Sequence, residues 1–198
     1  MKQLGERAQR IVASAIALAE DGGFEAVRLR DIAAHAQVAL GTVYKRFSSK
    51  EDILVAVLEH EVERLEAWLR LQPVEGDDGL SRLTSFFERL TAAFFRKPKL
   101  ARAALRAAAA GDPSLASKVG RFHARMTTLI AEAVVTAGLD REAGGLTEAE
   151  VQTLAYLLSQ VWFAALVGWM GGLFDQDAVI EQVRTACRLL LRGLAREG

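Results

Sequence analysis

Residues 22–54 read GGFEAVRLRDIAAHAQVALGTVYKRFSSKEDIL, and this stretch contains two short helical patterns in close succession. The first pattern is a set of apolar residues at helical spacing, namely Leu29, Ile32, Ala33 and Ala36. Residues 37–39 separate it from a second pattern at 40–47. In this second pattern Val43 and Phe47 lie four positions apart, so both can face a core. We therefore predict two short helices joined by a three-residue turn.

Longer helices are predicted on both sides of this pair. Residues 5–20 carry one apolar face, and the glycine pair at 22–23 is expected to end that helix because glycine adopts a left-handed cap at little cost. Residues 48–51 read SSKE, a capping-box match with Ser first and Glu fourth, which predicts a new helix from there to about Leu71. This is the helix-turn-helix layout, whose second helix is small enough to enter the major groove of DNA. The layout alone also occurs in proteins that bind no nucleic acid.

The whole chain is predicted to be all-α, with about nine helices. Ala and Leu, which are strong helix formers, are abundant, and the 198 residues include only three Pro. Helical spacing continues through residues 80–97, 101–110, 114–137, 147–174 and 176–196. We expect a DNA-binding domain at 1–50 with its helix-turn-helix motif at about 28–47, a linking helix at about 50–71, and an effector-binding and dimerisation domain at 72–198.

Residues 151–174 form an uncharged run of 24 residues, which is long enough to cross a bilayer. Gln152 and Gln160 interrupt the run, and its flanks are acidic where a membrane span commonly has basic residues. A helix buried on most of its circumference, in a core or at a subunit interface, has the same composition. We therefore favour a buried helix and no membrane association over a membrane span.

The charge is unevenly distributed along the chain. The 25 basic and 25 acidic residues give a formal net charge of +0, which taken alone argues against nucleic-acid binding. Residues 28–50, however, hold five cations against one acid, Asp31, so this segment has a net charge of +4 and the rest of the chain −4. A basic segment on an acidic body is the distribution that a phosphate-binding surface requires.

The sequence predicts no catalytic chemistry. His35, His60 and His123 lie far apart and form no metal-binding pattern, and no nucleophile elbow or phosphate-binding loop is present. Cys187 is the one cysteine, so neither an internal disulfide nor a thiol-rich zinc site can form. We expect a protein that is not an enzyme and has no metal or cofactor. The single cysteine fits a reducing, cytoplasmic compartment, and the charged first residues lack the apolar region of a signal peptide.

Residues 22–54 resemble the DNA-binding domain of the TetR family of bacterial transcriptional regulators. The matching segments are Gly23–Glu25, Arg30–Ala33, Gly41–Tyr44, Phe47 and Ser49–Asp52. The resemblance implies a homodimeric regulator whose N-terminal helices bind a palindromic operator in double-stranded DNA. It also implies a C-terminal helical domain that dimerises and binds a small effector.

Two positions depart from the family pattern. Arg28 stands where Thr or Ser commonly caps the second helix, which removes a cap worth about 0.5–2 kcal/mol but adds a cation. Gln37 stands where the turn commonly has Gly, and it costs about 1 kcal/mol if that residue is left-handed. Neither departure removes a phosphate-binding group, so DNA binding remains the prediction.

Eight residues are candidates for contact with DNA: Arg28, Arg30, Ala39, Leu40, Thr42, Tyr44, Lys45 and Lys50. Lys50 and the hydroxyls of Thr42 and Tyr44 are expected at phosphates, which position a protein without reading sequence. Lys45 is the candidate for reading a guanine edge, which offers two acceptors in the major groove. The plain alternative is that these side chains are simply solvated.

Eight mostly aromatic residues are candidates for holding a hydrophobic small-molecule effector: Phe94, Phe95, Leu105, Phe122, Met126, Trp162, Phe163 and Trp169. The alternative is that they form an ordinary core. His123 lies in the same region and either bonds a ligand carbonyl or satisfies a neighbour. Residues 23–27, 38–42 and 161–169 loosely resemble repressors of bacterial steroid degradation, which respond to steroid acyl-CoA intermediates, so this resemblance implies an apolar effector.

The resemblance also assigns a role to the uncharged segment. In the family the last two long helices of each subunit commonly build a four-helix dimer interface, which would explain the lack of charge at 151–174. Trp162, Ala165, Leu166 and Trp169 are then candidates for the interface or the pocket, and the alternative is the core of one chain. The favoured function is a ligand-responsive repressor, and the alternative is a helical small-molecule-binding dimer without specific DNA binding.

Overall fold

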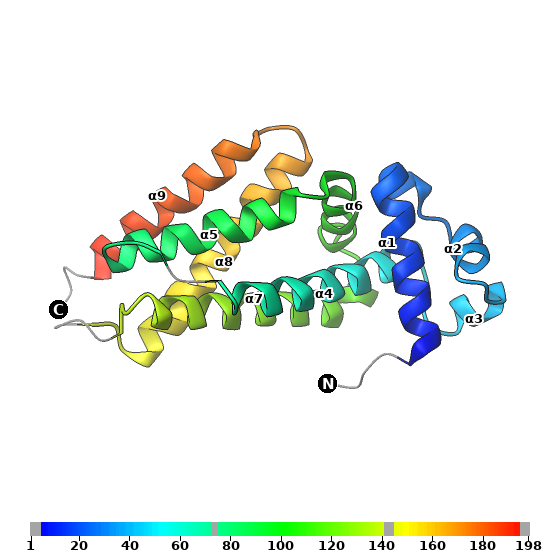
Figure 1. The fold of residues 1–198 in the computed structure, drawn as a ribbon, viewed down its shortest axis with the longest axis horizontal. Helices are drawn as coiled ribbons and strands as arrows, with labels where there is room; N and C mark the ends of the chain where they lie inside the picture. Colours follow the sequence, from blue (N-terminus) through cyan, green and yellow to red (C-terminus); the bar gives the residue numbers. More distant parts are fainter. Residues whose placement is uncertain (1–4, 73–74, 141–144, 195–198) are drawn as a thin grey trace. The chain divides into compact units, whose positions relative to one another are not determined.

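The computed structural model describes residues 5–72, 75–140 and 145–194. These residues form nine α-helices and no strand, which confirms the all-α prediction (Figure 1). In chain order the elements are α1 Glu6–Ala26, α2 Leu29–His35, α3 Leu40–Tyr44, α4 Lys50–Leu69, α5 Gly79–Phe95, α6 Pro98–Ala108, the short 3₁₀ helix η1 Pro113–Leu115, α7 Ala116–Thr136, α8 Glu148–Met170 and α9 Gln176–Leu194. The ends of the chain and parts of the loops between α4 and α5 and between α7 and α8 lie outside the described residues.

The helices pack as two compact units. The first, which we name the head unit, comprises Met1–Glu63 and Arg96–Gly120, and the second, the body unit, comprises Arg64–Phe95 and Arg121–Gly198. Helices α4 and α7 contribute to both units. The head unit therefore contains α6 in addition to the helices expected at residues 1–50. The assignment of DNA binding to residues 1–50 and of effector binding and dimerisation to residues 72–198 remains a prediction.

The core of the head unit is built from the apolar faces that the sequence pattern predicts. Its inaccessible side chains include Ile11, Val12, Ala15, Ile32, Val43, Ile53 and Leu54. Ala103 and Ala107 of α6 belong to the same core, and α6 packs closely along α1 (Figure 1). The burial of these apolar faces fixes the orientation of the short helices α2 and α3 within the head unit.

The first helix breaks where the glycine pair predicts. The backbone leaves helical conformation at Gly23, with φ of +68° and ψ of −156°, a combination that glycine adopts without a side-chain clash. The segment after the break ends at Ala26, and Val27 then buries its side chain in the head core. The break thereby turns the chain away from α1 and toward α2.

The turn between α2 and α3 is closed by a left-handed residue. Gln37 has φ of +53°, and among the described residues it is the one non-glycine residue with positive φ. Its N–H donates to the carbonyl of Ala34 at 3.2 Å, and the N–H of Val38 donates to the carbonyl of Ala33 at 3.0 Å. These are the two hydrogen bonds of a Schellman C-cap, and Val38 then packs on the head core.

Replacing Gln37 by glycine is expected to raise the free energy of unfolding by about 0.5–1 kcal/mol. The left-handed conformation costs a non-glycine residue about 1–2 kcal/mol, and the greater freedom of glycine in the unfolded chain takes back part of the gain. Thermal or urea unfolding measures the change. The matched control is Ala17→Gly in the exposed middle of α1, where glycine costs about 1 kcal/mol relative to alanine. Equal destabilisation by both variants would contradict the strained turn.

The start of α4 is capped one residue later than the sequence pattern predicts. Ser49 is the N-cap, and its hydroxyl accepts a hydrogen bond from the N–H of Asp52 at 3.1 Å. Asp52, and not Glu51, reaches back, accepting from the N–H and the hydroxyl of Ser48 at 3.0 and 3.2 Å. Asp52 is 5% exposed and also pairs with the ammonium of Lys118 on α7. This distant cation compensates the buried carboxylate, and the pairing accompanies the later register of the cap.

In the body unit α9 packs against both α5 and α8 (Figure 1). The capping box predicted at the start of α8 is confirmed: the hydroxyl of Thr147 accepts from the N–H of Glu150 at 3.3 Å, and the Glu150 carboxylate accepts from the N–H of Thr147 at 2.7 Å. Hydrogen bonds from Thr147 hold the pKa of Glu150 below its ordinary value. Helix α8 therefore begins where the sequence predicts.

Four α8 residues that were candidates for an interface or a pocket lie inside the body unit. They are Trp162, Ala165, Leu166 and Trp169, each no more than 3% exposed. They fill the core of a single chain, so the interface interpretation of these four residues is wrong. The exposed apolar surface of α8 is formed instead by Tyr156 and Leu157. The sequence pattern missed this because α8 is apolar around most of its circumference.

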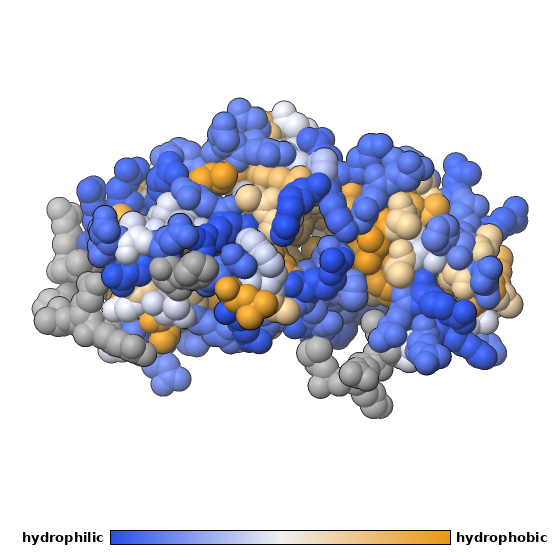
Figure 2. Space-filling view, viewed as in Figure 1, coloured by the Kyte–Doolittle hydropathy of each residue, from blue (hydrophilic) through white to orange (hydrophobic). Residues whose placement is uncertain are grey.

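Helix α8 is the one helix in the described part of the chain that is long and apolar enough to cross a membrane. Half of its most apolar 18-residue window is buried within the protein. Hydrophilic side chains cover most of the face seen in Figure 2, with smaller apolar patches between them. These observations favour the buried helix over the membrane span.

Candidate nucleic-acid interface

Helix α3 separates an inner face from an outer one. Val43 of α3 is buried in the head core, as predicted, and so is Phe47, although α3 ends at Tyr44 and is shorter than the predicted helix at 40–47. Tyr44 is 56% exposed, Lys45 is exposed, and Thr42 is partly exposed. The buried pair fixes the helix, so its outer face presents a phenol hydroxyl, an ammonium and a hydroxyl in fixed positions. Groups of these types bind phosphates and base edges.

The other predicted DNA contacts flank this face. Arg28 is exposed at the N-cap of α2 and makes no side-chain capping bond there, in agreement with the missing cap predicted from the sequence. Arg30 is exposed in the first turn of α2, and Ala39 is exposed at the N-cap of α3. Leu40 differs, because part of its side chain packs against the head core. Its role is therefore partly structural.

Lys50 is the first residue of α4, and its side chain is 27% exposed. Its ammonium lies 3.6 Å from the carboxylate of Glu25 and 3.8 Å from the ring centroid of Phe24. The structure thus holds the Lys50 side chain, which is predicted to contact a DNA phosphate, in a specific place within the head unit. Neither partner was predicted from the sequence.

A second cation reaches the same two partners from α6. The guanidinium of Arg106 lies 3.0 Å from the Glu25 carboxylate and 3.9 Å from the Phe24 ring centroid. Arg106 and Glu25 are 81 positions apart in the chain. No local pattern links residues at that separation, so the sequence carried no signal for this cluster of Phe24, Glu25, Lys50 and Arg106.

The aromatic candidates for effector binding form three ring contacts in the body unit. Phe94 meets Trp162 edge-on with centroids 5.7 Å apart, and Phe95 lies 4.5 Å from Trp169. The third contact joins rings on α7 and α8, where Phe122 and Phe163 have centroids 6.1 Å apart. Met126 is also buried in the body unit, whereas Leu105 is buried in the head unit. Their role in effector binding remains a prediction.

His123 joins the third ring contact. Its imidazole lies 4.6 Å from Phe163 and 5.1 Å from Phe122, in an edge-on arrangement with each. Burial among these rings lowers the pKa of His123 below its ordinary value, because the charged form is desolvated. At neutral pH the imidazole is therefore uncharged, and its ring nitrogens are the polar atoms in a cluster whose other two rings are hydrocarbon.

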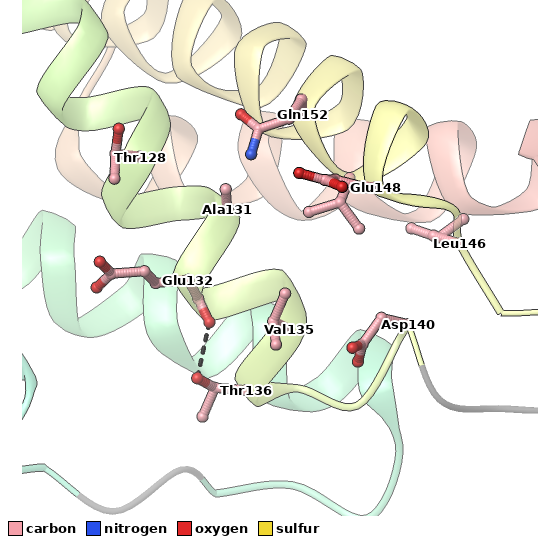
Figure 3. Close-up of a pocket in the computed structure, with 10 residues that line it drawn as sticks. Thr128, Ala131, Glu132, Val135, Thr136, Asp140, Leu146, Glu148 and Gln152 are labelled. Carbon is pink, nitrogen blue, oxygen red and sulfur yellow. Dashed lines mark hydrogen bonds between the residues drawn. The ribbon is translucent and has the colours of Figure 1, made fainter.

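A surface groove of about 690 Å³ lies elsewhere in the body unit, between the C-terminal half of α7 and the start of α8 (Figure 3). Its lining combines apolar residues such as Ala131 and Val135 with the carboxylates of Glu132 and Glu148. None of the eight residues predicted to hold the effector lines it. This groove therefore does not test the effector prediction.

Other reactive groups are not gathered into a site. Within the described residues no group of three His, Cys, Asp or Glu side chains is placed to hold a metal ion. Cys187 is buried in α9, and this burial raises the pKa of its thiol to about 12. A thiol in this state is a poor nucleophile, so Cys187 serves as an apolar core side chain.

The head unit and its exposed third helix define a helix-turn-helix protein of the DNA-binding class, joined to a second helical unit. The chain belongs to the TetR family of bacterial transcriptional regulators. The family model described as "Bacterial regulatory proteins, tetR family" matches residues 11–57, and the model described as "Tetracyclin repressor-like, C-terminal domain" matches residues 76–190. The family prediction is thereby confirmed.

Similar curated proteins are transcriptional repressors. The HTH-type transcriptional repressor KstR of Mycobacterium tuberculosis is 32% identical over 186 residues, which are 94% of this chain and 81% of that protein. KstR of Rhodococcus jostii is 34% identical, over 94% of this chain and 83% of that protein. These relatives agree with the repressor subgroup that the sequence resembles.

Solved structures share the whole fold. A TetR transcriptional regulator from Rhodococcus sp. RHA1 is 25% identical, with a TM-score of 0.78 over 96% of this chain and 97% of that one. FadR of Thermus thermophilus, a TetR-family repressor solved in complex with lauroyl-CoA, is 23% identical, with a TM-score of 0.75 over 94% of both chains. The likeness extends over both the head and the body units.

Proposed function

We propose that this regulator is a cytoplasmic homodimeric repressor that binds a palindromic operator and is released by a hydrophobic effector. The observation that carries the DNA-binding part is the outer face of α3, where Tyr44 and Lys45 are exposed while Val43 and Phe47 anchor the helix. The concentration of cations at residues 28–50 supports the same role, because phosphate binding depends on local positive charge. The similarity to KstR repressors supports repression.

Dimerisation is proposed through the outer surfaces of α8 and α9. Tyr156 and Leu157 on α8 are 55% and 40% exposed, and Leu189 on α9 is 60% exposed. Large apolar side chains exposed on adjacent helices are typical of a surface that a partner covers. A dimer places two copies of α3 on DNA, which matches the two halves of a palindromic site.

The proposed effector is an acyl-CoA with an apolar acyl group, such as a steroid acyl-CoA. The aromatic cluster of Phe122, His123 and Phe163 supports an apolar ligand with one polar group, since it combines two hydrocarbon rings with an uncharged imidazole. The lauroyl-CoA bound to Thermus thermophilus FadR supports the acyl-CoA class. Release of operator DNA on adding a steroid acyl-CoA, but not free coenzyme A, tests this assignment.

Titration against the DNA upstream of its own gene tests operator binding. Wild-type protein is expected to bind at least about 10³-fold more tightly to this DNA than to random DNA. Replacing Lys50 by alanine is expected to weaken binding to all sequences and to reduce the salt slope by about 0.9 for each phosphate that is no longer neutralised. The measurement is the dissociation constant at two or more salt concentrations.

Arg70→Ala is the matched control, because it removes an exposed cation just after α4 in the body unit, away from α8 and α9. This variant is expected to keep both the affinity and the salt slope of the wild type. Equal affinity of the wild type for upstream and random DNA would favour the alternative function, a small-molecule-binding dimer without specific DNA binding. An unchanged slope in Lys50→Ala would remove Lys50 from the phosphate-binding residues.

A further inference from the structure

The Glu25 carboxylate divides its two oxygens between two cations. Oε2 lies 3.6 Å from the ammonium of Lys50, and Oε1 lies 3.0 Å from Nη1 of Arg106. The shorter contact, which is also a hydrogen bond, belongs to Arg106. Glu25 is therefore held more closely by α6 than by α4.

Phe24 gives the two cations a second common partner. The Lys50 ammonium and the Arg106 guanidinium lie 3.8 and 3.9 Å from its ring centroid, both within the range of a cation–π contact. Lys50 and Arg106 thus share one carboxylate and one aromatic ring as partners. Since the cluster has two cations and one anion, its net charge is +1. The side chains of Glu25 and Arg106 are 74% and 56% exposed, so the cluster is open to an approaching ligand.

Glu25 has opposite consequences for Lys50 in the two states of the protein. In free protein it pairs with Lys50 and helps to position it. When DNA is bound, a phosphate competes for the same ammonium, and the nearby carboxylate repels that phosphate. Arg106 reduces this conflict because it neutralises Glu25 and remains its partner when Lys50 turns to the phosphate.

We infer that Arg106 is a positioning residue for DNA binding, which acts by holding Glu25 so that Lys50 is available to a phosphate. This inference rests on the proposed function, specifically on phosphate binding by Lys50. Arg106 needs no contact of its own with DNA in this scheme. Its effect on affinity therefore passes through Glu25.

A double-mutant cycle tests this route. Arg106→Gln is expected to weaken operator binding about three- to tenfold, since exposed ion pairs have modest energies and a dimer contains two such clusters. Glu25→Gln is expected to strengthen binding, and in that background Arg106→Gln is expected to have no further effect. Arg106→Lys, which keeps the charge, is expected to stay within about twofold of wild type. The measurement is the operator dissociation constant at two salt concentrations, with the thermal midpoint of each variant as the folding control.

The outcomes separate this inference from the function on which it rests. If the wild type binds operator and Lys50→Ala weakens it, but Arg106→Gln changes nothing, the positioning role is wrong. If Arg106→Gln weakens binding by the same factor in the wild type and in the Glu25→Gln variant, Arg106 contacts DNA directly. The route through Glu25 is then wrong. Absence of specific binding by the wild type, or an unchanged salt slope in Lys50→Ala, would instead contradict the proposed function.

Discussion

Replacing Lys45 by alanine is expected to weaken operator binding by about 2–6 kcal/mol, because each half-site of the dimer is then without one base interaction worth about 1–3 kcal/mol. Lys45 is exposed at the C-terminal end of α3, and its backbone N–H donates to the carbonyl of Gly41 at 3.1 Å. Removing the side chain leaves that backbone bond in place. The variant is therefore expected to fold normally and to be impaired in recognition alone.

The sequence dependence of this effect is the critical measurement. Wild type and Lys45→Ala are titrated against a series of operators in which one symmetric pair of base pairs is changed at a time. The two proteins are expected to bind equally to the operator that lacks the guanine read by Lys45, and unequally to all others. Lys50→Ala provides the contrast, because removing a phosphate ligand weakens binding to every operator alike. Uniformly weaker binding by Lys45→Ala would show that Lys45 also binds a phosphate.

The helix-turn-helix region could be predicted from the sequence because its determinants are local. The break at Gly23, the turn at Gln37 and the buried pair Val43 and Phe47 each follow from residue type and short-range spacing. Local spacing did not predict the start of α4 correctly, because the N-cap is Ser49 and not Ser48. Two serines in succession allowed two capping registers, and the pairing of Asp52 with the distant Lys118 accompanies the one observed.

Long-range pairings were beyond prediction for a related reason. Lys50, its partner Glu25 and the second partner of Glu25, Arg106, come from three separate helices, α4, α1 and α6. Helical periodicity says which face of a helix is apolar, but not which charged side chains two helices bring together. The exposed cations of α3 could be predicted, whereas the surroundings that control Lys50 required the three-dimensional arrangement.

The orientation of α8 was missed because its polar side is narrow and uncharged, formed by Gln152, Tyr156 and Gln160. Such a helix gives only a weak signal for which face meets its own chain and which remains exposed. The structure turns Trp162 and Trp169 inward and leaves Tyr156 and Leu157 outside. The prediction of a buried helix was therefore supported, while the assignment of individual residues to the interface failed.

Replacing Trp162 by phenylalanine is expected to lower the free energy of unfolding by about 2–4 kcal/mol. Trp162 is 1% exposed, and its indole Nε1–H donates to the hydroxyl of Thr91 on α5 at 3.0 Å. Its ring also meets Phe94 edge-on. The substitution leaves a cavity and removes the polar link between these two buried side chains, and both effects destabilise a close-packed core.

A double-mutant cycle with Thr91→Val separates the hydrogen bond from the packing. Thr91→Val is expected to cost about 1–3 kcal/mol, because it keeps the shape of the side chain but leaves the buried indole N–H without its acceptor. Combining it with Trp162→Phe should cost less than the sum of the two, since neither polar partner then remains. The free energy of unfolding of every variant is measured by denaturant unfolding at one protomer concentration. Leu173→Ala is the surface control, because the Leu173 side chain is 77% exposed. Its free energy of unfolding is expected to stay within about 0.5 kcal/mol of the wild type. Strict additivity would mean that the hydrogen bond adds nothing to stability, and an unchanged stability in Trp162→Phe would contradict the expected contribution of this side chain to the core.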